Sequence, residues 1–374
     1  MTKRLTTARL LVEGAGFCSD LWYASGFQPV DPVVFLDEGT RRTLVVPMLE
    51  FGRARAEAST SEVVLPEHLG IPPEERRSLG QQALHVLRHR QVTQVEVHSF
   101  FPAGIARLLE QHGVKVEIRA GSLYPERMVK TAEEIAKIVK AQRASVAAMR
   151  AAADILRASS KGRHGVLKWK GATLTSERVR EAIDTTLLRH GCIARDTIVA
   201  GGAQAADPHD RGHGPLKAGE AIVIDIFPQD KRTGYWGDIT RTFCKGCPSP
   251  ALARMYRTVL AAQKQSLAML RHGVVASTIH AANQAYFNEQ GFPTTVKDGV
   301  VRGFFHGTGH GVGLDIHEAP SIGLAAVTLR VGHVVTVEPG LYDPDVGGVR
   351  IEDTVAVEPA RARILAAFPK SFEV

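Results

Sequence analysis

The stretch Ala221-Ile-Val-Ile-Asp225-Ile-Phe227 has the composition of an apolar strand, yet it carries a carboxylate in its middle. An apolar run of this kind is typical of a strand that is buried on both faces. Side chains two residues apart share a face, so Asp225 faces the same way as Ala221 and Val223. A buried carboxylate is costly unless it is paired or binds a metal ion. Asp225 therefore either ends the strand at a turn, since Pro228 follows, or binds a partner.

A second acidic strand follows that turn. Residues 235–243 read Tyr-Trp-Gly-Asp-Ile-Thr-Arg-Thr-Phe, and alternation places Asp238 on one face and Ile239 and Phe243 on the other. If this strand pairs antiparallel with the first, Asp225 and Asp238 can point the same way. Acids near hairpins are usually solvated, so the pair by itself is weak evidence for a site.

Further along, the chain carries three histidines and two more strand acids. Residues 306–317 read His-Gly-Thr-Gly-His-Gly-Val-Gly-Leu-Asp-Ile-His, and so many imidazoles among glycines favour a site. Glu338 ends the apolar run 334–337 before a Pro-Gly turn, and Glu352 lies on the polar side of the alternating stretch 348–355. Either glutamate could instead face solvent, which is the commoner fate of Glu.

Four carboxylates and one histidine on apolar strands suit two divalent cations. The five residues are Asp225, Asp238, His310, Glu338 and Glu352. Ionised acids 4 Å apart repel by about 4 kcal/mol per pair at an effective dielectric near 20, and two dications would balance four carboxylates. Oxygen donors with one imidazole favour manganese, cobalt, iron or zinc over a thiolate-type site. The sequence therefore indicates a two-metal site, provided that the five side chains converge.

The order of these motifs resembles that of the pita-bread metallopeptidases, which include Xaa-Pro dipeptidases (prolidases), Xaa-Pro aminopeptidases and methionine aminopeptidases. The resemblance extends from about residue 126 to the end of the chain. It rests on Asp225, Asp238-Ile-Thr-Arg-Thr242, Gly309-His-Gly-Val-Gly313, Glu338-Pro-Gly340 and Arg350-Ile-Glu-Asp353. It implies that Asp225, Asp238, His310, Glu338 and Glu352 hold two divalent metal ions, with manganese favoured and with Asp238 and Glu352 bridging. It also implies a homodimer.

The chain is expected to be an α+β protein with two domains. Its 374 residues, of which 44% are hydrophobic, suffice for two cores. Residues 1–125 are expected to form a small N-terminal α/β domain of the creatinase type, and 126–374 a pita-bread (creatinase/aminopeptidase-like) catalytic domain. The capping box at 131–134 predicts the start of a long helix, and 176–190 a second one. Residues 159–175 are interpreted as an extended helical connection, either a surface insertion or a dimer contact.

Other residues match the proline-handling branch of the family. His306 and His317 match two histidines of that branch, and Arg350 matches an arginine beside the last ligand. The pair Pro208-His209 loosely matches a proline-histidine pair upstream of the first aspartate. His209 could instead be a turn histidine, and Arg350 could merely neutralise the glutamate at 352.

The resemblance also implies a role for each of these residues. Glu338 is expected to take a proton from water and deliver it to the leaving nitrogen. His317 is expected to stabilise the oxyanion, and His306 completes the catalytic set. His209, Arg350 and both of these histidines are expected to bind the substrate around the proline ring or its carboxylate.

The expected reaction is hydrolysis of the amide bond before proline in short peptides. A water bridging two dications has its pKa lowered towards neutrality, so hydroxide can attack the scissile carbonyl. The compact chain favours a dipeptidase. The turn at 226–237 is longer than is usual in the family, which leaves substrate preference open. Alternatives are an aminopeptidase without proline preference, an Xaa-Pro aminopeptidase acting on longer peptides, a silent binding protein, and a hydrolase or lyase of a small non-peptide metabolite.

Composition argues against several other functions. The formal net charge of +7 is spread along the chain, which disfavours a nucleic-acid partner. No run approaches the roughly 18 apolar residues of a membrane helix, and no signal-peptide core is present near the start. The four cysteines are scattered, which predicts a reducing compartment, and Cys244 and Cys247 lack the second pair that a zinc site needs. We therefore expect a cytoplasmic enzyme with a short peptide as its partner.

Overall fold

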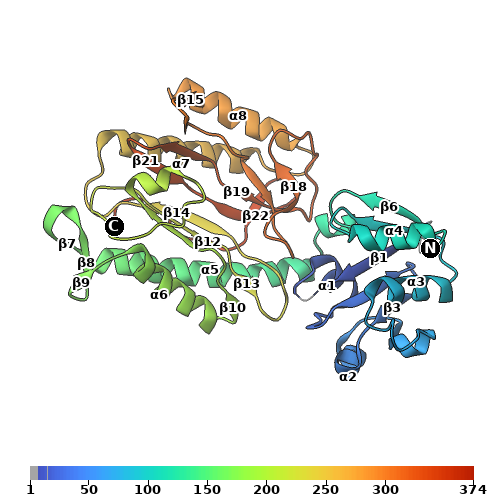
Figure 1. Ribbon diagram of the computed structural model, residues 1–374. Helices are drawn as coiled ribbons and strands as arrows, with labels where there is room; N and C mark the ends of the chain where they lie inside the picture. The colour runs from blue at the N-terminus through green and yellow to red at the C-terminus, as the bar shows by residue number, and fades with distance from the viewer. Residues whose placement is uncertain (1–6, 15) are drawn as a thin grey trace. The chain divides into compact units, whose positions relative to one another are not determined.

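The computed structural model describes residues 7–14 and 16–374 (Figure 1). The chain forms two compact units, with the boundary between Arg127 and Met128. Both units combine helices with sheets, as the predicted α+β class requires. Within the described part of the chain, no helix is long and apolar enough to cross a membrane.

The N-terminal unit is a six-stranded mixed sheet of order β4-β3-β2-β1-β5-β6 with helices on both faces. Its strands are β1 (Ala8–Glu13), β2 (Val33–Asp37), β3 (Arg42–Val45), β4 (Glu62–Val64), β5 (Gln94–His98) and β6 (Lys115–Arg119). Its helices are α1 (Ser19–Ser25), α2 (Met48–Glu57), α3 (Leu79–His89) and α4 (Ala103–Gln111), with the short 3-10 helix Pro66–Leu69. Alternation along β1 separates two cores: Leu10 packs with α3 and α4, whereas Leu11 packs with α1 and α2.

The C-terminal unit, Met128–Val374, contains four long helices and several small sheets. The helices are α5 (Ala132–Ala158), α6 (Ser176–Arg189), α7 (Pro250–Met269) and α8 (Ala276–Glu289). The strands of the first half are β7 (Ser160–Lys161), β8 (Leu167–Trp169), β9 (Ala172–Thr173), β10 (Cys192–Ile193), β11 (Ile198–Gly201), β12 (Ile222–Ile226), β13 (Gln229–Asp230) and β14 (Ile239–Phe243). Those of the second half are β15 (Thr295–Lys297), β16 (Val300–Arg302), β17 (Gly309–Gly311), β18 (Glu318–Ile322), β19 (Val334–Val337), β20 (Gly340–Asp343), β21 (Gly347–Arg350), β22 (Asp353–Val357) and β23 (Ala362–Ile364).

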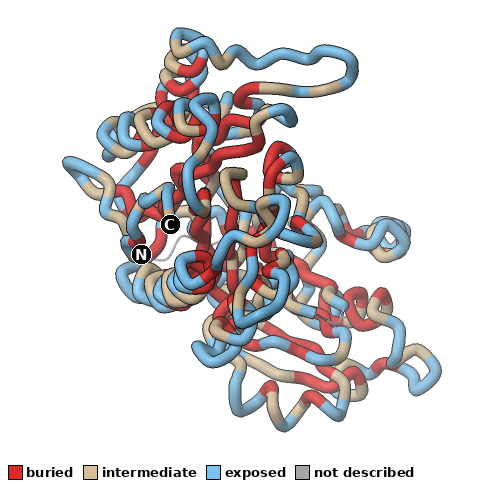
Figure 2. Tube along the Cα trace, turned by 90° about the vertical axis from the view of Figure 1, so that its left-hand side faces the viewer, coloured by how far each residue is buried: buried red, intermediate tan, exposed pale blue. Residues whose placement is uncertain are grey.

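Two sheets form the centre of this unit, with α5 and α6 on one side and α7 and α8 on the other (Figure 1). One sheet has the order β11-β12-β14 and the other the order β18-β17-β19-β22-β23. Strand β12 is buried along its whole length, as predicted, and Figure 2 shows such buried segments in red. Its Ile224 packs with α5 and α6, whereas Val223 packs with α7 and α8. Asp225, two residues from Val223, therefore faces the α7 side.

The second strand alternates as the sequence predicts. β12 and β14 pair antiparallel, with Asp225 opposite Thr240. Ile239 and Phe243 lie in the apolar cluster with α5 and α6. Because directly opposed residues share a face, Thr240 and Asp225 point to the same side of the sheet. Asp238, two residues before Thr240, follows the same alternation.

Helix α5 begins where the sequence predicts. The Thr131 hydroxyl accepts from the Glu134 N–H at 3.2 Å, and Glu134 Oε2 accepts from the Thr131 N–H at 2.8 Å. The predicted second helix is also confirmed as α6.

The expected helical connection at 159–175 is wrong, because this segment is the antiparallel sheet β7-β8-β9. Lys170 and Gly171 both have positive φ, of 50° and 77°. Two consecutive residues of positive φ match the twist of a tight hairpin, and a glycine adopts this conformation without steric cost. The Lys-Gly pair is therefore a hairpin signal that the sequence interpretation overlooked.

Arg241 on β14 ties that strand to the chain around residue 352. Its guanidinium is fully buried and pairs with Asp353 Oδ1 at 2.7 Å. It also donates to the carbonyl oxygens of Glu352, Thr240 and Phe368. Every side of this buried cation thus has a partner. Removing it would leave Oδ1 of Asp353 and several carbonyl oxygens without this donor, although Lys370 Nζ still pairs with Asp353 Oδ2 at 2.6 Å.

Replacing Arg241 with Met should lower the free energy of unfolding by about 1–3 kcal/mol, because Oδ1 of Asp353 and several buried carbonyl oxygens lose their donor while Lys370 still pairs with Asp353. Urea denaturation of the two proteins measures this difference. Arg363→Ala is the matched control, since Arg363 pairs with Glu358 at the surface and such pairs contribute only about 0–1 kcal/mol. Equal effects of the two substitutions would contradict a framework role for Arg241.

Candidate metal centre

Three of the predicted ligands gather at one point. Ligand atoms of Asp238, His310 and Glu352 all lie within 4.8 Å of one another. Asp238 directly precedes β14, His310 lies in β17, and Glu352 occupies the break between β21 and β22. His310 Nε2 is 3.6 Å from Asp238 Oδ2. Asp238 and Glu352 are buried and His310 is partly buried, so this group is not a solvated surface cluster.

Glu338 joins the same group from the end of β19. Its Oε1 lies 3.3 Å from Nε2 of His310. Thr336 orients both residues: its hydroxyl donates to Glu338 Oε1 at 3.2 Å and accepts from the His310 N–H at 3.0 Å. Thr336, on β19, thus connects the carboxyl of Glu338 at the end of that strand with the backbone of His310 on β17.

Asp225 faces the group from β12. Its partner across the ladder, Thr240, donates to Glu352 Oε2 at 2.8 Å. Asp225 Oδ2 accepts from Arg350 Nη2 at 2.8 Å. Its other oxygen, Oδ1, is buried and has no hydrogen-bond partner among the described residues. An unpartnered buried carboxylate oxygen is costly, so this atom is suited to bind a cation.

The electrostatics of the group also favour a cation. Burial raises the pKa of the Asp238 carboxyl well above its usual value, and the charges of Glu352, Asp225 and Glu338 raise it further. Burial, followed by the Glu338 and Asp225 charges, likewise raises the pKa of Glu352 well above its usual value. The pKa of Glu338 is raised as well, mainly by burial. Without added positive charge these acids therefore resist ionisation together.

His310 is arranged as a neutral ligand. Burial lowers the pKa of its imidazole. Its Nδ1 lies 3.2 Å from the Gly311 carbonyl oxygen, and in the tautomer that donates there, Nε2 carries the lone pair. Nε2 is the nitrogen that faces Asp238 and Glu338. A ring nitrogen that donates to a carbonyl while the other faces carboxylates is the usual arrangement of a metal-binding histidine.

Two of the four predicted substrate-binding residues, His306 and Arg350, belong to one hydrogen-bonded chain beside the acids. His306 Nε2 lies 2.9 Å from the hydroxyl oxygen of Tyr342, which accepts from Arg350 Nη1 at 2.9 Å. Arg350 Nη2 continues the chain to Asp225. The ion pair of Arg350 is therefore made with Asp225 and not, as the alternative interpretation had it, with Glu352. Burial lowers the pKa of His306. Its Nδ1 lies 2.7 Å from the Gly307 carbonyl oxygen, and in the tautomer that donates there Nε2 accepts from the Tyr342 hydroxyl.

Two further histidines border the site. The rings of His317 and His310 meet edge to face, with centroids 4.2 Å apart. His317 and His209 are both exposed. Burial lowers the pKa of His317, and the charges of His310 and His209 contribute to that shift. The His209 charge also contributes to the shift at His306, so it lies within electrostatic range of both rings.

Tyr342 is a site residue that the sequence interpretation missed. It lies on β20, is almost completely buried, and its hydroxyl joins His306 to Arg350. A buried tyrosine hydroxyl normally requires a partner. The sequence contained no sign of one, because Tyr342 stands in a short strand after the Glu338-Pro-Gly turn, and only its packing shows what surrounds it.

The long turn at 226–237 is held by strand pairing and by hydrogen bonds to the loop after β17. Its β13 pairs with β10, and Trp236 donates its backbone N–H to the Gly313 carbonyl and its indole N–H to the Leu314 carbonyl, each at 2.9 Å. The turn therefore holds the loop that carries His310 and His317.

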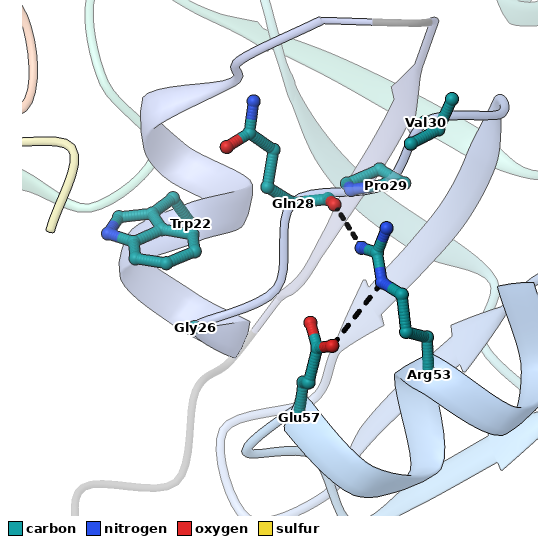
Figure 3. A pocket seen from close by; sticks show the side chains of 7 residues that line it. All are labelled: Trp22, Gly26, Gln28, Pro29, Val30, Arg53 and Glu57. Atoms are coloured by element: carbon teal, nitrogen blue, oxygen red, sulfur yellow. Dashed lines mark hydrogen bonds and ion pairs between the residues drawn. The ribbon is translucent and has the colours of Figure 1, made fainter. Parts of the chain in front are cut away.

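The N-terminal unit has an open pocket of about 580 Å³ (Figure 3). It is lined by Trp22, Gly26, Gln28, Pro29, Val30, Arg53 and Glu57. Its two charged residues, Arg53 and Glu57, pair with each other at 3.4 Å. This pocket therefore lacks the convergent acids and histidines of the site in the C-terminal unit.

In the metal-free protein, Glu352→Gln should raise the free energy of unfolding at pH 7 and leave it nearly unchanged near pH 4. The folded-state pKa of Glu352 is raised, so the wild-type carboxyl stays protonated while the unfolded chain ionises, and stability falls as the pH rises above about 4. Urea titrations at both pH values, in the presence of chelator, measure the difference. The control is Glu358→Gln, which changes the glutamate that pairs with Arg363 at the surface and should give no such gain. A loss of stability for Glu352→Gln at pH 7 would contradict the electrostatic account.

Comparison with known proteins agrees with this geometry. The pattern of metallopeptidase family M24 matches residues 136–359. The chain is 29% identical over 344 residues to an Xaa-Pro dipeptidase of Pyrococcus horikoshii, covering 90% of this chain and 87% of that protein. Among solved structures, it is similar to the prolidase of Pyrococcus furiosus, with a TM-score of 0.77, 26% identity, and 97% and 96% of the two chains covered.

The structure of an X-Pro aminopeptidase from Thermotoga maritima has the same fold, with a TM-score of 0.79, 24% identity, and 98% and 97% coverage. These similarities confirm the predicted α+β architecture with a pita-bread catalytic domain. They also confirm the resemblance on which the sequence analysis relied. The chain therefore belongs to metallopeptidase family M24.

Proposed function

We propose that this protein is a dinuclear-metal Xaa-Pro dipeptidase, which hydrolyses the amide bond before proline in short peptides. The observation that carries the proposal is the convergence of three carboxyl groups, those of Asp238, Glu338 and Glu352, on the imidazole of His310, with the Asp225–Arg350 pair and further histidines beside them. The names of the similar Pyrococcus proteins support the choice of substrate.

The donor set fits two divalent metal ions. The residues that would hold them are Asp225, Asp238, His310, Glu338 and Glu352. The family resemblance implies that Asp238 and Glu352 would be the ligands shared by the two ions, and both belong with His310 to the compact group within 4.8 Å. Arg350 occupies only one oxygen of Asp225, which leaves the buried Oδ1 as the ligand atom. Oxygen donors with a single imidazole favour manganese.

Bound metal ions would supply Lewis acidity, which lowers the pKa of water and polarises the scissile carbonyl. Glu338 is placed to move the proton, because its carboxyl lies beside His310 and keeps a small exposed fraction, 16%. His317, exposed beside His310, can donate to the oxyanion that develops on the carbonyl.

The proline end of the substrate is proposed to bind against His306, His209 and Arg350. Tyr342 holds His306 and Arg350 in fixed relation. Arg350 carries a permanent positive charge, and the substrate of a dipeptidase has a carboxylate one residue beyond the cleaved bond, so a cation beside the acids selects short substrates. We further propose that residues 1–125 and 126–374 act as N-terminal and catalytic domains. The homodimer and the cytoplasmic location stay predictions.

The chelator-stripped protein should be inactive, and added Mn²⁺ should restore cleavage of Xaa-Pro dipeptides. A panel comparing Xaa-Pro and Xaa-Ala dipeptides with Xaa-Pro-Yaa tripeptides measures the preference. Glu338→Gln should lower kcat by at least about 100-fold, because the proton carrier and a metal ligand are lost. Glu289→Gln, which changes an exposed glutamate at the end of α8, should leave kcat unchanged.

Two results of that panel would overturn parts of the proposal. Equal rates on Xaa-Ala and Xaa-Pro dipeptides would make the protein a general peptidase. A metal-loaded protein that cleaves none of these peptides would remove the peptide substrate and leave a small non-peptide metabolite as the alternative.

A further inference from the structure

Asp238 is held at its backbone by a glutamine from helix α5. Gln142 Nε2 donates to the Asp238 carbonyl oxygen at 2.7 Å, and Gln142 Oε1 accepts from the Asp238 N–H at 2.7 Å. Gln142 is completely buried. These two hydrogen bonds join residues that lie 96 positions apart in the sequence.

The position of Asp238 explains why such a partner is needed. The ladder between β12 and β14 ends with the pair Ile226 and Ile239, so Asp238 lies one residue outside it. A buried backbone N–H and C=O without partners would be costly. An amide side chain donates and accepts at once, so Gln142 replaces the missing strand and keeps the chain extended at Asp238. Thr354 Oγ1 donates to the same carbonyl at 2.8 Å.

Helix α5 approaches this segment as closely as backbones permit. A Cβ atom on Gly237 would lie 2.7 Å from both the carbonyl carbon of Ala141 and the nitrogen of Gln142. Only glycine therefore fits at 237. The contact restricts movement of the chain at Gly237, directly before Asp238, so α5 limits where the backbone that carries this carboxylate can lie.

Other side chains of the same helix hold the segment before Asp238. Glu134 Oε1 accepts from the Tyr235 hydroxyl at 2.8 Å, and Lys140 Nζ pairs with Asp230 Oδ2 at 2.6 Å. Of the three tethers, only that of Gln142 reaches the backbone of a candidate metal ligand.

We propose that Gln142 is a positioning residue of the metal centre: by fixing the backbone of Asp238 it presets this carboxylate towards His310 and Glu352 and raises the affinity for divalent metal. The inference rests on the proposed function, in which Asp238 is a metal ligand. Gln142 touches neither substrate nor metal, so its effect must pass through Asp238.

Gln142→Met, which keeps length but removes both hydrogen bonds, is the test variant. Mn²⁺ chloride is titrated into the chelator-stripped, full-length protein in a calorimeter. We expect Mn²⁺ to bind at least about tenfold more weakly than to the wild type, because partners that orient ligands typically contribute 10–100-fold. At saturating Mn²⁺, kcat should return towards the wild-type value with KM unchanged.

Ser145→Ala is the matched control. Ser145 is buried one turn further along α5 and lies against Gly237, but its hydroxyl donates only to the Ala141 carbonyl of its own helix. This variant should bind Mn²⁺ within twofold of the wild type, although it too removes a buried hydrogen-bonding group. A loss of affinity equal to that of Gln142→Met would show a general packing effect and overturn the proposal.

Thermal unfolding of the metal-free variants establishes that each is folded at the temperature of the titration. If Gln142→Met does not fold, Gln142→Asn decides, since it keeps a buried amide that is too short to reach both backbone groups and should also weaken Mn²⁺ binding. Wild-type affinity in whichever of these variants folds would overturn the proposal. A wild-type protein that binds no Mn²⁺ would instead refute the metal centre itself.

Discussion

The crowding of four carboxyl groups around one imidazole is the constraint on which the catalytic unit depends. Burial and mutual repulsion raise the pKa values of Asp238, Glu338 and Glu352, so the folded chain disfavours the state in which all three are ionised. At about 4 kcal/mol per pair of neighbouring charges, such repulsion rivals the net stability of a domain. In the proposed metal centre, a divalent cation would reduce this repulsion and give the buried Oδ1 of Asp225 a partner, so metal binding would stabilise the fold.

Rigidity around the acids comes from neutral hydrogen bonds and one buried cation. Thr240 and Thr336 orient Glu352 and Glu338, while Arg241 secures the backbone at residue 352. Gln142 does the same at Asp238. Because most of these groups are neutral, they fix the positions of the ligands without cancelling the negative charge that a metal ion requires.

The side of the site towards the substrate has the opposite character. Arg350, Tyr342 and His306 form one hydrogen-bonded chain that ends on Asp225, so the proposed substrate-binding residues and a proposed metal ligand are physically connected. Family membership establishes the fold and the metal-dependent chemistry. We expect substrate preference to depend on Arg350, Tyr342 and His306 and on the loop that Trp236 contacts.

The alternation of residue types in the sequence predicted which side chains lie on the same face of a strand. Period-two alternation placed Asp225 with Val223 and Asp238 apart from Ile239, and the resemblance identified the order of the ligands. Tyr342, Gln142 and the hairpin sheet at 159–175 lay beyond it. That the acids lie close together is visible only in the folded chain, since Thr240 and Glu352, which share a hydrogen bond, are 112 positions apart in the sequence. Alternation is local and can be read from neighbouring residues, whereas convergence depends on how distant strands pack, and no short-range pattern encodes that.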